Sequence, residues 1–279
     1  MRPLVLSAIL FLTVQANAPA DIDASFAPPG WQQFQGDHFV VLCPPGDTQD
    51  FANDVLNHAE DYYHDIADDI GYSRYRNFWT WNDRVKIVLF QDQAAYVRLT
   101  GKPAWSGGFA SEHSRLFKTR VIVSYKGQPN FINVILPHEI THLILHDFIG
   151  FGRPVPRFFD EGVAQLEQKD DSLQHMDVMA RMILEGKIIP LSDLPDFDLM
   201  AHQNDPQIVS IFYVESLYIV DFLVKTYGKD SFKELCRHLR DGEDFRQALK
   251  SSYYPTLDSM RSLQEKWVEY AKQYFYEDK

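Results

Sequence analysis

Two histidines and a glutamate lie within five consecutive residues of an otherwise apolar segment. They are His138, Glu139 and His142, in the run from Phe131 to Leu145. On a helix, residues four apart share one face, so the two imidazoles can bind one metal ion while Glu139 projects beside them. Burying these groups without an ion would be costly. The segment therefore predicts a buried metal-binding helix.

Two neutral imidazoles and one carboxylate suit a borderline-soft, tetrahedral ion, so we expect a single zinc ion with one more protein ligand. A second helix is predicted to begin near Phe158, after a loop from Gly150 to Pro156 that holds two glycines and two prolines. If this helix packs beside the first, Glu161 faces the histidines as the third ligand. Asp160 competes for the same role.

Together these motifs give the chain a family resemblance. It resembles the glutamate-zincin metallopeptidases, the thermolysin-like branch of the zincins, and within them a bacterial peptidase-MA-like group. The matching segments are His138-Glu139-Ile140-Thr141-His142, Asp160-Glu161-Gly162-Val163-Ala164, Tyr213-Val214-Glu215-Ser216, Tyr227-Gly228 and Trp267-Val268-Glu269-Tyr270. The resemblance covers roughly residues 36–275 and is most specific in the first two segments.

The chain departs from the thermolysin-like pattern at one position. Many members carry an aspartate four residues after the glutamate ligand, where it orients a zinc-bound histidine, but this chain has Gln165. Its side-chain carbonyl could still accept an imidazole N–H, although it would leave that ligand less basic. The metzincin pattern is excluded, because Leu145 and Phe148 stand where it needs glycine and histidine.

The resemblance implies a zinc-dependent metallopeptidase. Glu139 would act as general base towards a zinc-activated water and then pass the proton to the leaving amine. Tyr213 is the candidate catalytic donor to the oxyanion, with an ordinary core aromatic as the equal alternative, and His202 is a weaker candidate. His146 is expected to be a packed or surface histidine.

Two other functions use the same residues. The first is a catalytically weak or inactive binding or scaffold protein that keeps the zincin fold, which Gln165 makes worth retaining. The second is a zinc hydrolase that acts on a non-peptide amide. Loss of peptide hydrolysis in a Glu139→Gln variant that keeps its zinc would favour the peptidase.

The net charge indicates which class of partner to expect, and the N-terminal sequence indicates the cellular location. A net charge of −12 argues against nucleic-acid binding, so a peptide or protein substrate is expected. Residues 1–20 read as a signal peptide, with Arg2 before the apolar run Leu4–Val14 and a small-residue patch at Ala16–Ala20. We therefore expect an exported protein, periplasmic or secreted, with no integral membrane span after the signal is removed.

We expect an α+β, zincin-like fold. Residues 21–279 would form the catalytic domain, with an α/β lobe at 21–130 and the zinc helices and a helical lobe at 131–279. The lobe should contain a small mixed sheet whose edge strand runs along the cleft, at Gly107–Ala110 or Arg120–Ser124, and an extended peptide could pair with it.

Other sequence features leave more open. The glycines of the first segment allow either close backbone approach or a plain hairpin turn. The proline-containing loop from Lys187 to Gln207 is long enough to cover a cleft. Cys43 and Cys236 are the only cysteines, and either a disulfide or two buried thiols is compatible with the sequence.

Overall fold

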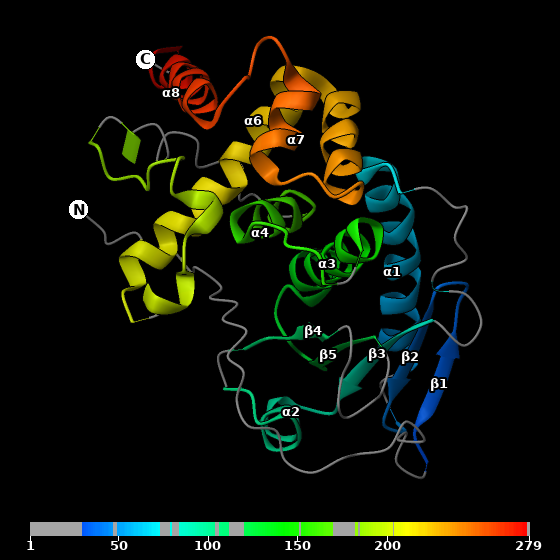
Figure 1. Cartoon of the computed structure of the whole chain (residues 1–279). Coiled ribbons are helices and arrows are strands. Elements are labelled where there is room, and N and C mark those ends of the chain that lie inside the picture. Colours follow the sequence, from blue (N-terminus) through cyan, green and yellow to red (C-terminus); the bar gives the residue numbers. More distant parts are fainter. Residues whose placement is uncertain are drawn as a thin grey trace.

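The structure is a computed structural model that describes residues 30–46, 49–72, 79, 84–103, 106–111, 120–150, 152–169, 182–183, 185–202 and 204–277. It is an α+β fold, with the strands gathered at one end and most of the helices packed beyond them (Figure 1). The predicted signal peptide lies outside the described residues, and so does most of the segment Leu173–Gly186, whose sequence pattern predicts a helix.

Within the described residues, the sheet is mixed and has five strands. In space their order is β1-β2-β3-β5-β4. The three central strands run parallel, and the two outer strands pair antiparallel to their neighbours. The strands are β1 (Gln32–Gln35), β2 (Phe39–Cys43), β3 (Val85–Phe90), β4 (Phe109–Ser111) and β5 (Val121–Tyr125).

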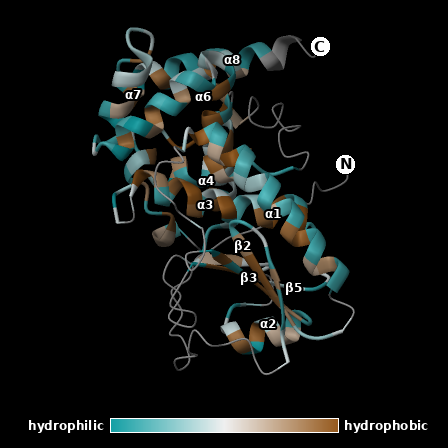
Figure 2. Ribbon diagram, turned by 90° about the vertical axis from the view of Figure 1, so that its right-hand side faces the viewer, coloured by the Kyte–Doolittle hydropathy of each residue, from teal (hydrophilic) through white to brown (hydrophobic). Residues whose placement is uncertain are grey.

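Alternating side chains divide the strands' apolar residues between two clusters. Helix α2 (Gln93–Thr100) covers one face, where Tyr96 packs with Val88 and Val123. Helix α1 (Gln49–Ile70) covers the other, and its buried residues join the main core with Val41 and Ile87. Apolar colouring is concentrated in the strands and in the helices above them (Figure 2). This two-sided burial explains why the central strands are apolar almost throughout.

Helix α3 (Leu136–Ile149) carries the histidine motif. It follows a π-helical turn at Phe131–Ile135, and Pro137 is its second residue, so the missing N–H falls where the π-helical turn passes into the α-helix. The helix is buried on nearly all sides and contacts α1, α4 (Arg157–Leu166) and β4. It therefore holds the motif rigidly between the sheet and the helical part of the chain (Figure 1).

The C-terminal part of the described chain is helical. Helix α6 (Pro206–Arg240) bends at Gly228, whose backbone is not helical, and is followed by α7 (Phe245–Tyr253) and α8 (Met260–Glu277). Among the described helices, α6 alone is long and apolar enough to cross a membrane, but 72% of its apolar window is buried inside the protein. It is thus accounted for as a core helix.

Gly162 sets the distance between α4 and α6. A Cβ atom at this position would lie 2.3 Å from the carbonyl oxygen of Ser216 and 2.7 Å from Val220 Cγ2. Two helices can approach this closely only where a side chain is absent. Because Glu161 is the neighbouring residue, this contact also fixes one of the candidate metal ligands.

We expect Gly162→Ala to destabilise the protein by about 2 kcal/mol, because the new methyl group pushes against backbone rather than a flexible side chain. Denaturant unfolding would measure this change. Helix propensity alone predicts the opposite, a stabilisation of about 1 kcal/mol. A more stable Gly162→Ala variant would therefore contradict the close packing described above.

Several sequence predictions can be compared directly with these elements. The apolar run Val85–Phe90 predicts a buried strand, and Gly228 predicts the end of a helix; the structure confirms both. Of the two candidate edge strands, Arg120–Ser124 is wrong, because β5 lies between β3 and β4 inside the sheet. The edge strand is β4. Strand β1 gives little sequence signal, because Phe34 is its single apolar residue and its other three positions are glutamines.

The alternatives left open by the sequence are also decided. A Cβ on Gly108 would lie 2.9 Å from Ile135 Cγ2 and 3.0 Å from Val123 O, so the glycine permits close approach. Cys43 and Cys236 are both buried and are not bridged to each other. The loop after Lys187 contains two 3-10 turns, Leu194–Asp196 and Leu199–His202, and buries several apolar residues.

Candidate metal centre and active site

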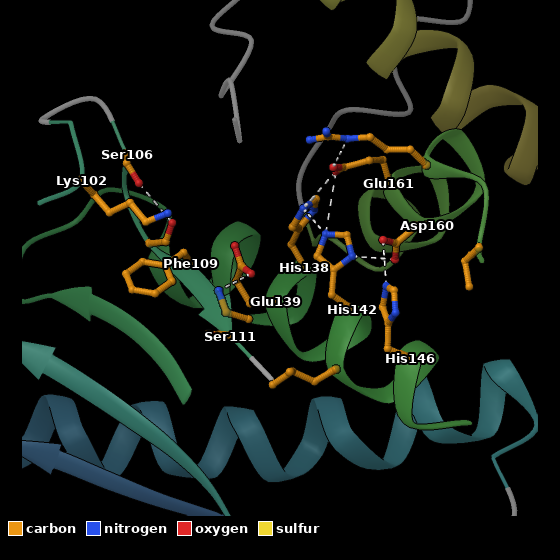
Figure 3. A pocket seen from close by; sticks show the side chains of 15 residues that line it. Lys102, Ser106, Phe109, Ser111, His138, Glu139, His142, His146, Asp160 and Glu161 are labelled. Atoms are coloured by element: carbon orange, nitrogen blue, oxygen red, sulfur yellow. Dashed lines mark hydrogen bonds and ion pairs between the residues drawn. The ribbon is translucent and has the colours of Figure 1, made fainter. Parts of the chain in front are cut away.

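The three predicted metal ligands converge. His138 and His142 lie one helical turn apart on α3, and their Nε2 atoms are 3.1 Å apart. Glu161, from the first turns of α4, places Oε2 at 3.6 Å from His138 Nε2 and 3.8 Å from His142 Nε2. Figure 3 shows the three side chains pointing towards one another. One ion could contact all three atoms.

Glu161 supplies a test of whether a cation fits. Its Oε2 atom is buried and has no hydrogen-bond partner among the described residues. Burial raises the pKa of Glu161 to about 7, and burial also raises the pKa of Glu139. Two buried carboxylates with costly negative charges, one with an orphaned oxygen aimed at two imidazole nitrogens, are what a bound dication would stabilise. The residues therefore fit a metal ion.

Asp160 orients the ring of His142 by a hydrogen bond to its Nδ1 atom. Its Oδ1 lies 2.7 Å from His142 Nδ1, and its Oδ2 lies 3.0 Å from His146 Nε2. Burial alone would lower the pKa of His142, but the charge and hydrogen bond of Asp160 outweigh it and raise that pKa to about 10. The imidazole of His142 can bind either a proton or a metal ion. The carboxylate of Asp160 stabilises the positive charge that each of them brings.

This arrangement corrects the role predicted for Gln165. Its amide donates to the backbone carbonyl oxygens of Glu161 and Tyr213, and so it ties α4 to α6 instead of accepting an imidazole N–H. The amide of Gln168, one turn further along, lies 2.8 Å from His138 Nδ1. Asp160, which the sequence offered as a competing ligand, thus orients His142 from the position before the glutamate.

We expect Asp160→Asn to lower zinc affinity by roughly 10- to 100-fold, because the variant loses the charge that makes His142 a strong donor. Competition with a chromogenic chelator would measure the affinity. Gln165→Ala is the matched control on the same helix and should leave zinc affinity unchanged. If the two variants lose affinity equally, Asp160 has no special role in orienting the histidine.

Glu139 connects the helix to the edge of the sheet. It is 5% exposed, and its Oε2 accepts a 2.7 Å hydrogen bond from the backbone N–H of Ala110 in β4. That N–H therefore points away from β5 and towards α3. The bond fixes the carboxylate beside the two imidazoles while leaving its other oxygen directed into the cleft region (Figure 3).

A cleft opens over this group. Its lining residues come from the loop before β4, from β4 itself, from α3 and from the start of α4: Lys102, Ser106, Gly108, Phe109, Ala110, Ser111, His138, Glu139, His142, Leu143, His146, Val155, Arg157, Asp160 and Glu161. Sequence reasoning missed the two cations, Lys102 and Arg157. A lysine after a turn and an arginine at a helix start are too common to indicate a site.

Each of the two cations lies near a carboxylate of the site. The pKa of Lys102 is lowered by burial, although attraction to Glu139 opposes the shift, and its ammonium lies 4.7 Å from the centre of the Phe109 ring. Arg157 Nε is 3.6 Å from Glu161 Oε1. The two cations partly offset the negative charge that the carboxylates bring to the cleft.

Tyr213 is hydrogen-bonded to Arg157. Burial raises the pKa of its phenol, the charge of Glu161 raises it further, and a hydrogen bond with Arg157 opposes the shift. Neither Tyr213 nor any described residue of the loop from Lys187 to Gln207, His202 included, is among the residues that line the cleft. A direct contact of Tyr213 with an oxyanion is therefore not evident, and the predicted covering role of the loop is not supported.

The model of the peptidase MA superfamily matches residues 82–273, which include α3, α4 and β4. The chain belongs to the peptidase MA superfamily. No curated protein matches it. In this peptidase MA chain, the matched segment contains every described residue that lines the cleft, and the resemblance drawn from the sequence motifs is confirmed.

Proposed function

We propose that this peptidase MA protein is a zinc-dependent peptidase whose ligands are His138, His142 and Glu161. The observation that carries the proposal is the convergence of their three ligand atoms, with the buried Glu161 Oε2 lacking any other described partner. Membership of the superfamily supports a metallopeptidase-like activity. The donor set of two imidazoles and one carboxylate favours zinc.

The zinc ion, when bound, would lower the pKa of a water molecule and polarise the peptide carbonyl. Glu139 is placed to receive the proton of that water and to return it to the leaving amine. The Ala110 N–H holds one carboxylate oxygen of Glu139, so the other can move the proton without the side chain changing its position. Lys102 favours the ionised form that a base requires.

Arg157 is the better placed donor for the developing oxyanion. It lines the cleft and lies against the ligand Glu161, whereas Tyr213 contacts Arg157. We propose that Arg157 faces the oxyanion and that Tyr213 orients the guanidinium. The role of Tyr213 as a direct donor stays a prediction from the family resemblance.

The substrate is proposed to be an extended peptide. Strand β4 is one of the two edge strands of the described sheet, and Gly108 to Ser111 all line the cleft. The outer side of such a strand offers backbone groups to a peptide that pairs with it, apart from the Ala110 N–H, which already bonds to Glu139. The peptide would then lie across Glu139 and the metal ligands, because β4 contacts α3 beside them.

Export is a proposal of its own. It rests on the signal-like pattern of residues 1–20, from which we propose that the processed protein lies in the periplasm or outside the cell. The catalytically inactive scaffold becomes less attractive as an alternative, because its main support was the neutral Gln165. Asp160 contributes the carboxylate that the alternative assumed to be missing.

Removal and return of the metal test the proposed function. The purified mature protein should cleave members of a mixed peptide library, lose this activity after chelation, and regain it with one equivalent of zinc at the centre. Mass spectrometry of the library would detect cleavage. A zinc-loaded, folded protein that cleaves no peptide in the library would contradict the proposed peptidase.

A further inference from the structure

A second group of metal-binding side chains lies away from the cleft. Its members are His38, just before β2, and Glu60 and His64 on α1; one ligand atom from each lies within 4.8 Å of the other two. Glu60 and His64 are four residues apart and so share a face of the helix. Strands β3 and β5 separate β2 from the cleft-lining β4, so this group is distinct from the candidate active site.

The carboxylate of this group is held in place by the backbone. Glu60 Oε1 accepts hydrogen bonds from the N–H groups of His38 at 2.9 Å and Phe39 at 3.2 Å. Glu60 Oε2 then faces His38 Nδ1 at 2.7 Å. A Cβ at Gly36 would lie 2.2 Å from Glu60 Oε1, so a glycine is needed there for the carboxylate to approach.

The two imidazoles are also oriented. The ring of His38 is stacked on that of Tyr63, with their centres 3.8 Å apart. The ring of His64 is nearly perpendicular to that of His38, at an interplanar angle of 88° and a centre-to-centre distance of 5.4 Å. The rings of His138 and His142 show a similar arrangement, at 84° and 4.7 Å. Only His64 is exposed, so an ion could enter from solvent.

We propose that His38, Glu60 and His64 form a second zinc site, which joins the start of β2 to the middle of α1. Two nitrogens and a carboxylate oxygen suit zinc, and solvent would complete its coordination. The net charge of −12 favours cation binding in general. The site would be structural, because it lies outside the cleft and connects two elements of the same core.

Metal stoichiometry separates this proposal from a simple His38–Glu60 ion pair. Equilibrium dialysis against buffered zinc, followed by elemental analysis, should give two ions per wild-type chain and one per His64→Ala chain. His58→Ala is the matched control: His58 is another exposed histidine of α1, paired with Asp54 four residues before it, and its loss should leave two ions bound. Peptide cleavage should be the same in all three proteins.

A second measurement keeps the test independent of the candidate active site. In a His138→Ala/His142→Ala variant, zinc should still bind once per chain and raise the melting temperature, and adding His64→Ala should abolish both effects. The proposal is overturned if wild type binds a single ion that the His138→Ala/His142→Ala variant loses entirely. It is overturned equally if His64→Ala binds as much zinc as wild type and therefore behaves like the control His58→Ala.

Discussion

Glu139→Gln lowers the rate of peptide hydrolysis by roughly 10²- to 10⁴-fold and leaves zinc bound, if the carboxylate is the general base. Glutamine has nearly the same shape, and its side-chain oxygen can still accept the hydrogen bond from Ala110 N–H. The variant therefore keeps the geometry of the cleft and loses only the group that accepts a proton. Steady-state kinetics and elemental analysis on the same sample would measure both quantities.

Glu167→Gln is the matched control for this experiment. Glu167 is also buried, at 6% exposed, and burial raises its pKa to about 7, but it is not among the described residues that line the cleft. The same chemical change at this position should leave hydrolysis unchanged. If Glu139→Gln retains wild-type activity, Glu139 is not the base and the proposed mechanism fails.

Glu161→Gln has the second large expected effect, on zinc affinity at the centre. The variant replaces the charged oxygen that lies 3.6 and 3.8 Å from the two imidazole nitrogens with a neutral amide. We expect affinity to fall by more than the roughly 10- to 100-fold predicted for Asp160→Asn, because Glu161 contacts the ion directly. Activity should fall with zinc occupancy and return in part at high zinc concentration.

Chelator competition on Glu161→Gln, Asp160→Asn and wild type would establish this order. The competing ligand assignment predicts the reverse, with Asp160→Asn the more damaging change. Both variants should keep the cooperative unfolding of wild type, because neither side chain supplies apolar packing. A normal zinc affinity in Glu161→Gln would remove Glu161 from the metal centre.

The convergence of the three candidate metal ligands was predictable because the sequence signals for it are local. Four-residue spacing places His138 and His142 on one face of any helix, and the loop from Gly150 to Pro156 brings the next helix back beside it. The apolar surroundings of the motif indicated burial, which the structure confirms, with His138 1% and Glu161 5% exposed. The parallel strands were also predictable from a local signal, because each is a short apolar run.

The residues that support the ligands were harder to predict. Asp160 is adjacent to Glu161 in the sequence, yet its contact with His142 depends on how α4 packs against α3. The family pattern directed attention to Gln165 instead, whose amide binds backbone. Lys102 and Arg157 reach the cleft from separate segments, and no periodicity connects them.

Long-range pairing limited the remaining predictions. The group formed by His38, Glu60 and His64 joins residues more than twenty positions apart, so only the packing of α1 on β2 brings them together. The order of β4 and β5 depends on which strand pairs with β3, and the sequence offers both segments as edges. Sequence patterns indicate where helices and strands occur, but they indicate poorly which helices and strands pack or pair with one another.

Anomalous X-ray diffraction at the zinc edge, from crystals of the zinc-loaded protein, would test the central claim most directly. We predict a peak about 2.0–2.2 Å from His138 Nε2, His142 Nε2 and Glu161 Oε2, with Glu139 beside it but not bound. No peak at this position in crystals that contain zinc, or Glu161 directed away from the two imidazoles, would contradict the proposed metal centre and the peptidase mechanism that depends on it.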